Sequence, residues 1–79
     1  MLKLKNLKKN NGIISAEYDP ENSGELGSIS IDIEKETVVD FNISKLDGAF
    51  PIYANHAVDA LMKIMHNEEL PTEKLVMWY

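Results

Sequence analysis

Carboxylates are the side chains whose type and spacing come closest to a chemical site in this chain of 79 residues. Residues 26–34 and 38–44 alternate apolar and polar side chains, which predicts two neighbouring strands with one apolar face. If the two apolar faces are in phase, Asp32 lies directly opposite Asp40, with Glu34 one pair further along. Opposed carboxylates can bind a divalent cation or share a proton as an acid/base pair. Serines and an asparagine line the rest of this face, so we favour a weak repulsion between solvated carboxylates.

Two other groups of residues invite comparison with metal sites. Residues 19–25 read Asp-Pro-Glu-Asn-Ser-Gly-Glu, which has the acids, serine and glycine that begin a calcium loop. The twelfth position of that loop would be Ser30 rather than glutamate, so we expect a turn. His56 and His66 fall about 280° apart on a predicted helix and cannot bind one metal ion together. We therefore expect no metal site.

Motifs for catalysis or cofactor binding are missing from the sequence. The chain has no cysteine, and its four glycines are scattered rather than gathered in a phosphate-binding loop. No Gly-x-Ser-x-Gly segment provides a nucleophile. We name no catalytic residue and no cofactor, and we do not expect an enzyme.

Composition and charge indicate one small acidic domain spanning residues 1–79, with a net charge of −5. Four lysines fall within the first twelve residues, whereas all thirteen acidic residues come later. The basic segment could contact nucleic acid, or its lysines could protect the edge strand of a sheet. Arginine is absent, so we favour the edge strand and expect no direct binding of nucleic acid.

No run of apolar residues is long enough for a membrane span or a secretion signal. We expect a cytoplasmic protein of bacterial or phage origin with no membrane partner. Because a domain of this size buries little surface and has no disulfide, we also expect a homodimer.

Periodicity predicts an α+β fold: a two-layer sandwich with the element order ββββαβ. Asn11-Gly12 predicts a tight hairpin turn between the first two strands. Apolar residues recur every three or four positions from Ile52 to Glu69, which predicts an amphipathic helix that ends before Pro71. The predicted strands are 2–9, 13–18, 26–34, 38–44 and 75–79. The first four form an antiparallel meander, with Val39, Phe41 and Ile43 of the fourth turned inward.

The C-terminal segment is unusually apolar and aromatic. As a strand, it can lie antiparallel beside the first strand or parallel beside the fourth, and the sequence leaves both open. Leu75, Met77 and Tyr79 would then occupy one face, and Val76 and Trp78 the other. Because a sheet with one wet face cannot bury both sets, we expect an interface that includes Val76, Met77, Trp78 and Tyr79.

These observations favour a non-enzymatic module that self-associates and binds or regulates a protein partner. One alternative is an acidic mimic of nucleic acid that blocks a DNA-binding protein, using Asp32, Glu34 and Asp40. Another is a small ligand-binding protein or enzyme whose site forms between protomers, with Asp32, Asp40 and His56 as candidates.

Overall fold

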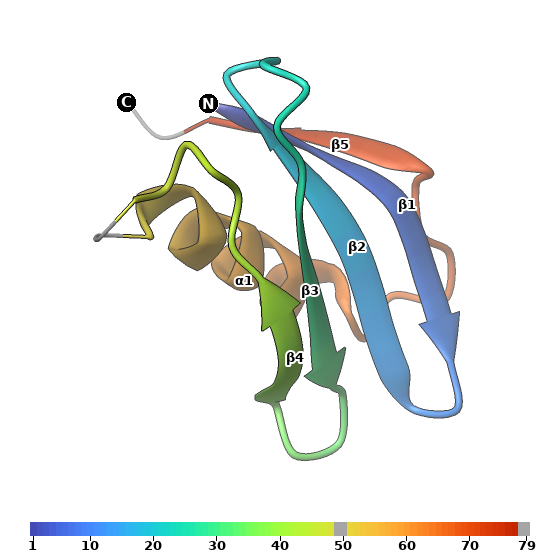
Figure 1. Ribbon diagram of the computed structural model, residues 1–79. Helices are drawn as coiled ribbons and strands as arrows, with labels where there is room; N and C mark the ends of the chain where they lie inside the picture. Colours follow the sequence, from blue (N-terminus) through green and yellow to red (C-terminus); the bar gives the residue numbers. More distant parts are fainter. Residues whose placement is uncertain (49–50, 78–79) are drawn as a thin grey trace.

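The protein folds into a five-stranded antiparallel sheet with one helix packed on one face (Figure 1). The computed structural model describes residues 1–48 and 51–77. The elements are β1 (Leu2–Asn10), β2 (Ile13–Pro20), β3 (Gly27–Asp32), β4 (Thr37–Asn42), α1 (Ile52–Ile64) and β5 (Glu73–Val76). The α+β class and the order ββββαβ are as predicted.

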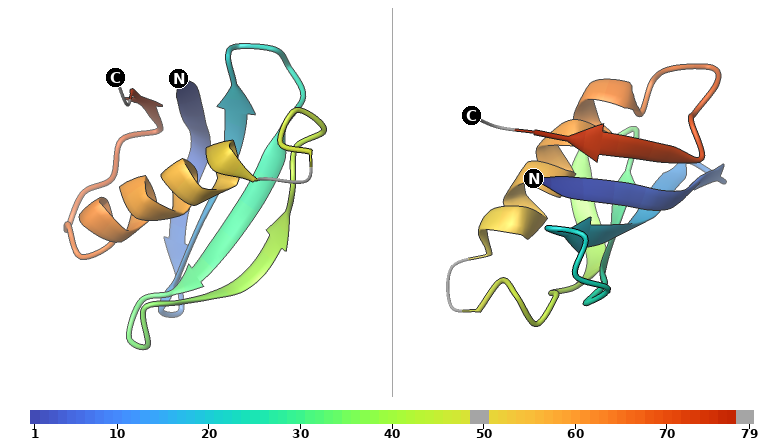
Figure 2. Two further views of the ribbon diagram at one scale, coloured as in Figure 1. Left: turned by 90° about the vertical axis from the view of Figure 1, so that its left-hand side faces the viewer. Right: turned by 90° about the horizontal axis from the view of Figure 1, so that it is seen from above.

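The strand order β4-β3-β2-β1-β5 decides between the two predicted positions of the last strand. β5 lies antiparallel beside β1, with Leu2 opposite Val76 and Lys5 opposite Glu73 (Figure 2). The parallel alternative beside β4 is therefore wrong. So is the assignment of the first strand to a sheet edge, because residues 2–5 have a neighbour on each side. The edge strands are β4 and β5.

The hairpin between β1 and β2 follows the predicted turn. Asn10 pairs with Ile13, and Asn11 and Gly12 both have positive φ, 52° and 79°. A type I′ turn requires this conformation at both central positions, and asparagine and glycine adopt it at low cost. The pairing register then shifts between Lys5 and Lys8, where β1 carries a bulge at Asn6.

Alternate residues of β1, β2 and β3 point toward the helix and form the core. The buried apolar residues on these strands are Leu2, Leu4, Ile14, Ala16, Tyr18, Ile29 and Ile31. Figure 2 shows α1 crossing this face of the sheet. Ala54, Ala57 and Ala60 are buried on α1, and their small side chains let the helix backbone approach the strands closely. Leu61 and Met65 complete the core at the far end of the helix.

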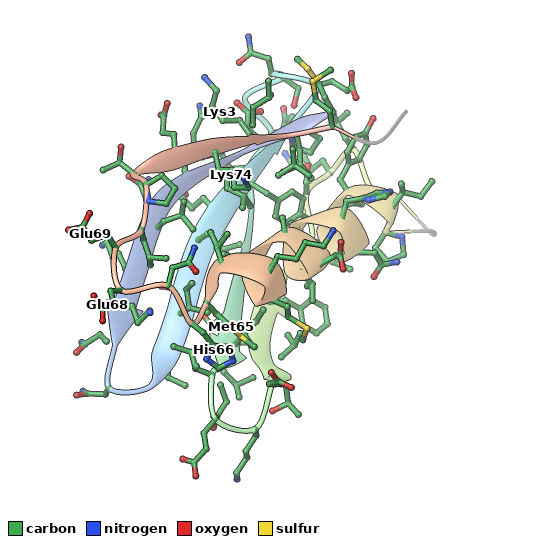
Figure 3. All side chains as sticks on the ribbon, turned by 180° about the vertical axis from the view of Figure 1, so that it is seen from behind. Lys3, Met65, His66, Glu68, Glu69 and Lys74 are labelled. Atoms are coloured by element: carbon green, nitrogen blue, oxygen red, sulfur yellow. The ribbon has the colours of Figure 1, made fainter. Side chains whose placement is uncertain are left out.

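The helix is shorter than predicted, ending at Ile64 rather than near Glu69. A tight turn follows the helix, in which the N–H of Asn67 donates to the carbonyl of Ile64, three residues earlier, at 3.0 Å. Figure 3 shows Met65 and His66 at this end of α1, with Glu68 and Glu69 in the connection that leads to β5. The connection must carry the chain from the helix layer back to the sheet edge, and a continued helix would carry it past β5.

Candidate functional site

The predicted pairing of Asp32 with Asp40 is wrong. Asp40 lies opposite Ser30, and Asp32 lies opposite Thr37. The register shifts between Ser30 and Ile31, because β4 has one residue more than β3 at that point. The in-phase alignment used for the prediction assumed two regular strands, and a bulge breaks that assumption.

The acidic residues near the β3–β4 turn consequently have separate roles. A side-chain oxygen of Asp32 accepts a hydrogen bond from the N–H of Lys35 at 3.0 Å, which stabilises the turn. Glu34 is exposed within the turn. Glu36 lies 3.4 Å from Nε2 of His66, so this contact links the turn to the end of the helix.

The two histidines lie in different surroundings. His56 lines a cleft of about 400 Å³ between α1 and β5, together with Asp59, Lys63 and Lys74. Asp59 and Lys63 form the ion pair expected one helical turn apart, at 3.0 Å. Within residues 1–48 and 51–77, no three His, Cys, Asp or Glu side chains are grouped so that they could hold a metal ion.

A buried polar cluster that the sequence reasoning missed is formed by Tyr18, Ser44 and Asp47. The Tyr18 hydroxyl donates to Oδ2 of Asp47 at 2.5 Å and accepts from the N–H of Ser44 at 2.8 Å. Oδ1 of Asp47 accepts from the N–H of Tyr53 at 2.8 Å, in the first turn of α1. A buried phenol requires a hydrogen-bond partner, so the inward position of Tyr18 was the signal that could have revealed this cluster.

This cluster is structural rather than catalytic. Tyr18 is fully buried and Asp47 nearly so, which leaves no room for a substrate at either oxygen. Burial, together with the hydrogen bond to Asp47, raises the pKa of Tyr18 to about 12. The phenol therefore stays protonated and joins the strand layer to the loop that begins the helix.

A second buried carboxylate, Asp19, fixes the loop between β2 and β3. It accepts from the N–H of Gly24 at 2.9 Å and lies 3.1 Å from Nζ of Lys5. Burial acts to raise the pKa of Asp19, but the Gly24 hydrogen bond and the Lys5 ammonium outweigh it and hold the pKa below its usual value. Residues 19–25, which resemble the start of a calcium loop, therefore form a turn that is closed by the carboxylate of Asp19.

The apolar face of the sheet is left partly uncovered at a groove between α1 and β4. The helix packs mainly on β1, β2, β3 and β5, and every residue of β4 is exposed. Val38, Phe41 and Ile43 are 40%, 57% and 43% exposed. They line a groove of about 280 Å³ with residues of α1 that include Ala54 and Val58.

The predicted inward set on this strand is only partly correct. Val38 pairs with buried Ile31 and Phe41 with buried Ile29, so Val38 and Phe41 share the face on which the helix lies. Val39 is the extra residue of the bulge and is 53% exposed. Phe41 and Ile43 do line the helix side, but neither is buried.

The residues of the predicted C-terminal interface lie in different surroundings. Val76 is half-buried and packs against the core, whereas Met77 is 58% exposed. Lys74 lies opposite Leu4, on the helix side of the sheet, and Lys3 is opposite Leu75 on the other side (Figure 3). Trp78 and Tyr79 lie outside the described residues.

The fold and the groove together define a small α+β protein with an incompletely covered sheet. Comparison of the chain with known protein families, curated proteins and solved structures finds no match. Among the described residues, no helix has the length and apolar character needed to cross a membrane.

Proposed function

We propose that this protein is a non-enzymatic interaction module of the cytoplasm that self-associates through the groove between α1 and β4. The observation that carries the proposal is the exposure of Val38, Phe41 and Ile43 beside a strand edge. Full burial of such a side chain from full exposure contributes roughly 1.5–3 kcal/mol, and these three are about half exposed, so covering each contributes roughly half of that and favours association. A free strand edge adds backbone hydrogen bonds to the same contact.

The charges on the opposite face of the sheet favour this function over mimicry of nucleic acid. Lys3 is opposite Asp19, and Lys5 is opposite Glu17, so cations and anions alternate there. A mimic of the phosphate backbone needs a continuous negative surface, which these lysines interrupt.

The candidate acid/base residues do not come together within one protomer. On β3 and β4, Asp32 lies opposite Thr37 and Asp40 lies opposite Ser30, on the face away from the helix. His56 belongs to α1, on the other face. A site that combined the three would have to take them from different protomers.

Sedimentation of the intact protein over a range of concentrations tests the proposal. We expect reversible association that Phe41→Ser weakens at least tenfold. Leu75→Ser is the matched control, because Leu75 is similarly exposed, at 52%, on the opposite edge strand. A monomer at all concentrations contradicts the proposal. Dissociation by Leu75→Ser alone would place the interface at β5 and the C-terminus instead.

A further inference from the structure

We propose that the occupant of the β4 edge is β4 of a second copy, paired antiparallel about a two-fold axis. The proposal rests on the function proposed above and specifies its geometry. Two five-stranded sheets would join edge to edge into one continuous sheet. The axis would pass between Val39 and Asp40, so that Val38 of each copy lies opposite Phe41 of the other.

The bulge in β4 is the first reason to expect this occupant. In a regular strand, residues three apart lie on opposite faces. Because of the extra residue, Val38 and Phe41 lie on one face, opposite Ile31 and Ile29. A two-fold axis between Val39 and Asp40 can therefore bring Val38 against Phe41 across the contact, with both apolar side chains on the helix side.

The same bulge argues against an unrelated extended peptide. Bulges at sheet edges discourage regular strands from adding to them, because the extra residue interrupts the hydrogen-bonding pattern. A second copy carries the same irregularity at the same position. At the two-fold axis the two bulges would face each other, so the ladder on either side stays in register.

Charge provides the second reason. With the axis between Val39 and Asp40, the two Asp40 carboxylates are offset rather than opposed, and each lies opposite Val39 of the other copy.

Two positions outside the apolar groove report this register directly. Thr37 lies opposite Asp32 and Asn42 opposite Ser28, on the face away from the helix. The proposed pairing places Thr37 of one copy opposite Asn42 of the other, within the range for a disulfide. Two copies of Thr37, or two of Asn42, would be about 16 Å apart, which is too far.

The natural chain has no cysteine, so single substitutions give unambiguous cross-links. Thr37→Cys and Asn42→Cys are oxidised separately and as an equimolar mixture, and the products are separated on a non-reducing gel. We expect a disulfide-linked dimer in the mixture, at least tenfold more abundant than in either variant alone.

Sedimentation of the unmodified protein separates the two proposals. If the protein is dimeric but the mixture fails to cross-link, or Asn42→Cys cross-links equally well alone, the β4 register is wrong and self-association stands. If the protein sediments as a monomer, both proposals fail. Thermal unfolding of each reduced variant, followed by circular dichroism, confirms that the fold is retained.

Discussion

Tyr18 and Gly27 face each other across β2 and β3, and a Cβ atom placed on Gly27 would lie 2.3 Å from the Tyr18 ring. No side chain larger than a hydrogen fits there without moving the ring. The ring cannot move freely, because its hydroxyl is held by Asp47 and Ser44. Gly27 is thus required by the space that the buried tyrosine occupies.

We predict that Gly27→Ala destabilises the protein by about 2–3 kcal/mol, the upper range for overpacking a core. Urea unfolding followed by circular dichroism measures the change. Ser30→Ala is the matched control, because Ser30 lies on the same strand with its side chain on the outer face. Equal effects of the two substitutions would contradict the steric argument.

Removing only the Tyr18 hydroxyl tests the buried cluster. Tyr18→Phe leaves a carboxylate oxygen of Asp47 and the N–H of Ser44 without their partner. We expect a loss of about 1.5–3 kcal/mol, as for hydrogen bonds to charged groups. Tyr53→Phe is the comparison, because its hydroxyl meets Glu21 at 3.3 Å in an exposed position. That change should cost under about 0.5 kcal/mol, as surface substitutions usually do.

The raised pKa of Tyr18 predicts a loss of stability at alkaline pH. The unfolded phenol loses its proton near pH 10, whereas the folded one keeps it until about pH 12. Between these values the unfolded state binds fewer protons, so the free energy of unfolding falls as pH rises. Urea unfolding between pH 8 and 11 should show this decline. The decline should be smaller in Tyr18→Phe, and an identical slope in the two proteins would refute the assignment.

Asp19 predicts the opposite dependence at acidic pH. Its pKa in the folded state lies below the unfolded value of about 3.9, so its contribution is complete above about pH 5 and is lost as pH falls below 4. Asp19→Asn should therefore cost about 1 kcal/mol at pH 7, because the roughly 1.5–3 kcal/mol of a charged hydrogen bond is reduced by screening of the partly exposed Lys5. The difference from the natural protein should narrow toward pH 3. Asp59→Asn, which removes an exposed ion pair, should show a small difference throughout.

The elements with regular periodicity were predictable from the sequence. Ile29 and Ile31 alternate with serines, and that alternation alone identifies the buried face of β3. Asn11-Gly12 determines the first turn by its conformational preference. The helix followed from its apolar stripe, although it ends at Ile64 rather than near Glu69.

The features that were missed depend on contacts between distant parts of the chain. Nothing local marks Val39 as a bulge, because the bulge exists only relative to β3. Asp47 reads as a turn residue, and its buried role follows from the arrival of Tyr18 beside it. The exposure of Phe41 depends on where α1 crosses the sheet, which amphipathic periodicity does not specify.

Deleting Val39 tests whether the bulge determines the proposed association. The shortened strand keeps Val38 opposite Ile31, Asp40 opposite Ser30 and Phe41 opposite Ile29, so we expect the monomer fold to survive. A two-fold pairing that still matches Val38 with Phe41 must now be centred on Asp40, which brings the two carboxylates face to face. Like charges directly opposite destabilise a strand pair, so the dissociation constant measured by sedimentation should rise at least fivefold.

Asp40→Asn in the deletion background removes the repulsion and should restore most of the lost affinity. In the natural chain the same substitution should change the affinity less than twofold, because the two Asp40 side chains are offset there. Only pairing through the bulge predicts that Asp40→Asn has different effects in the natural chain and in the deletion variant. If the contact involved only the groove between α1 and β4, Asp40→Asn would change the affinity equally in both. A deletion that left the affinity unchanged would mean that β4 does not pair with itself about this axis.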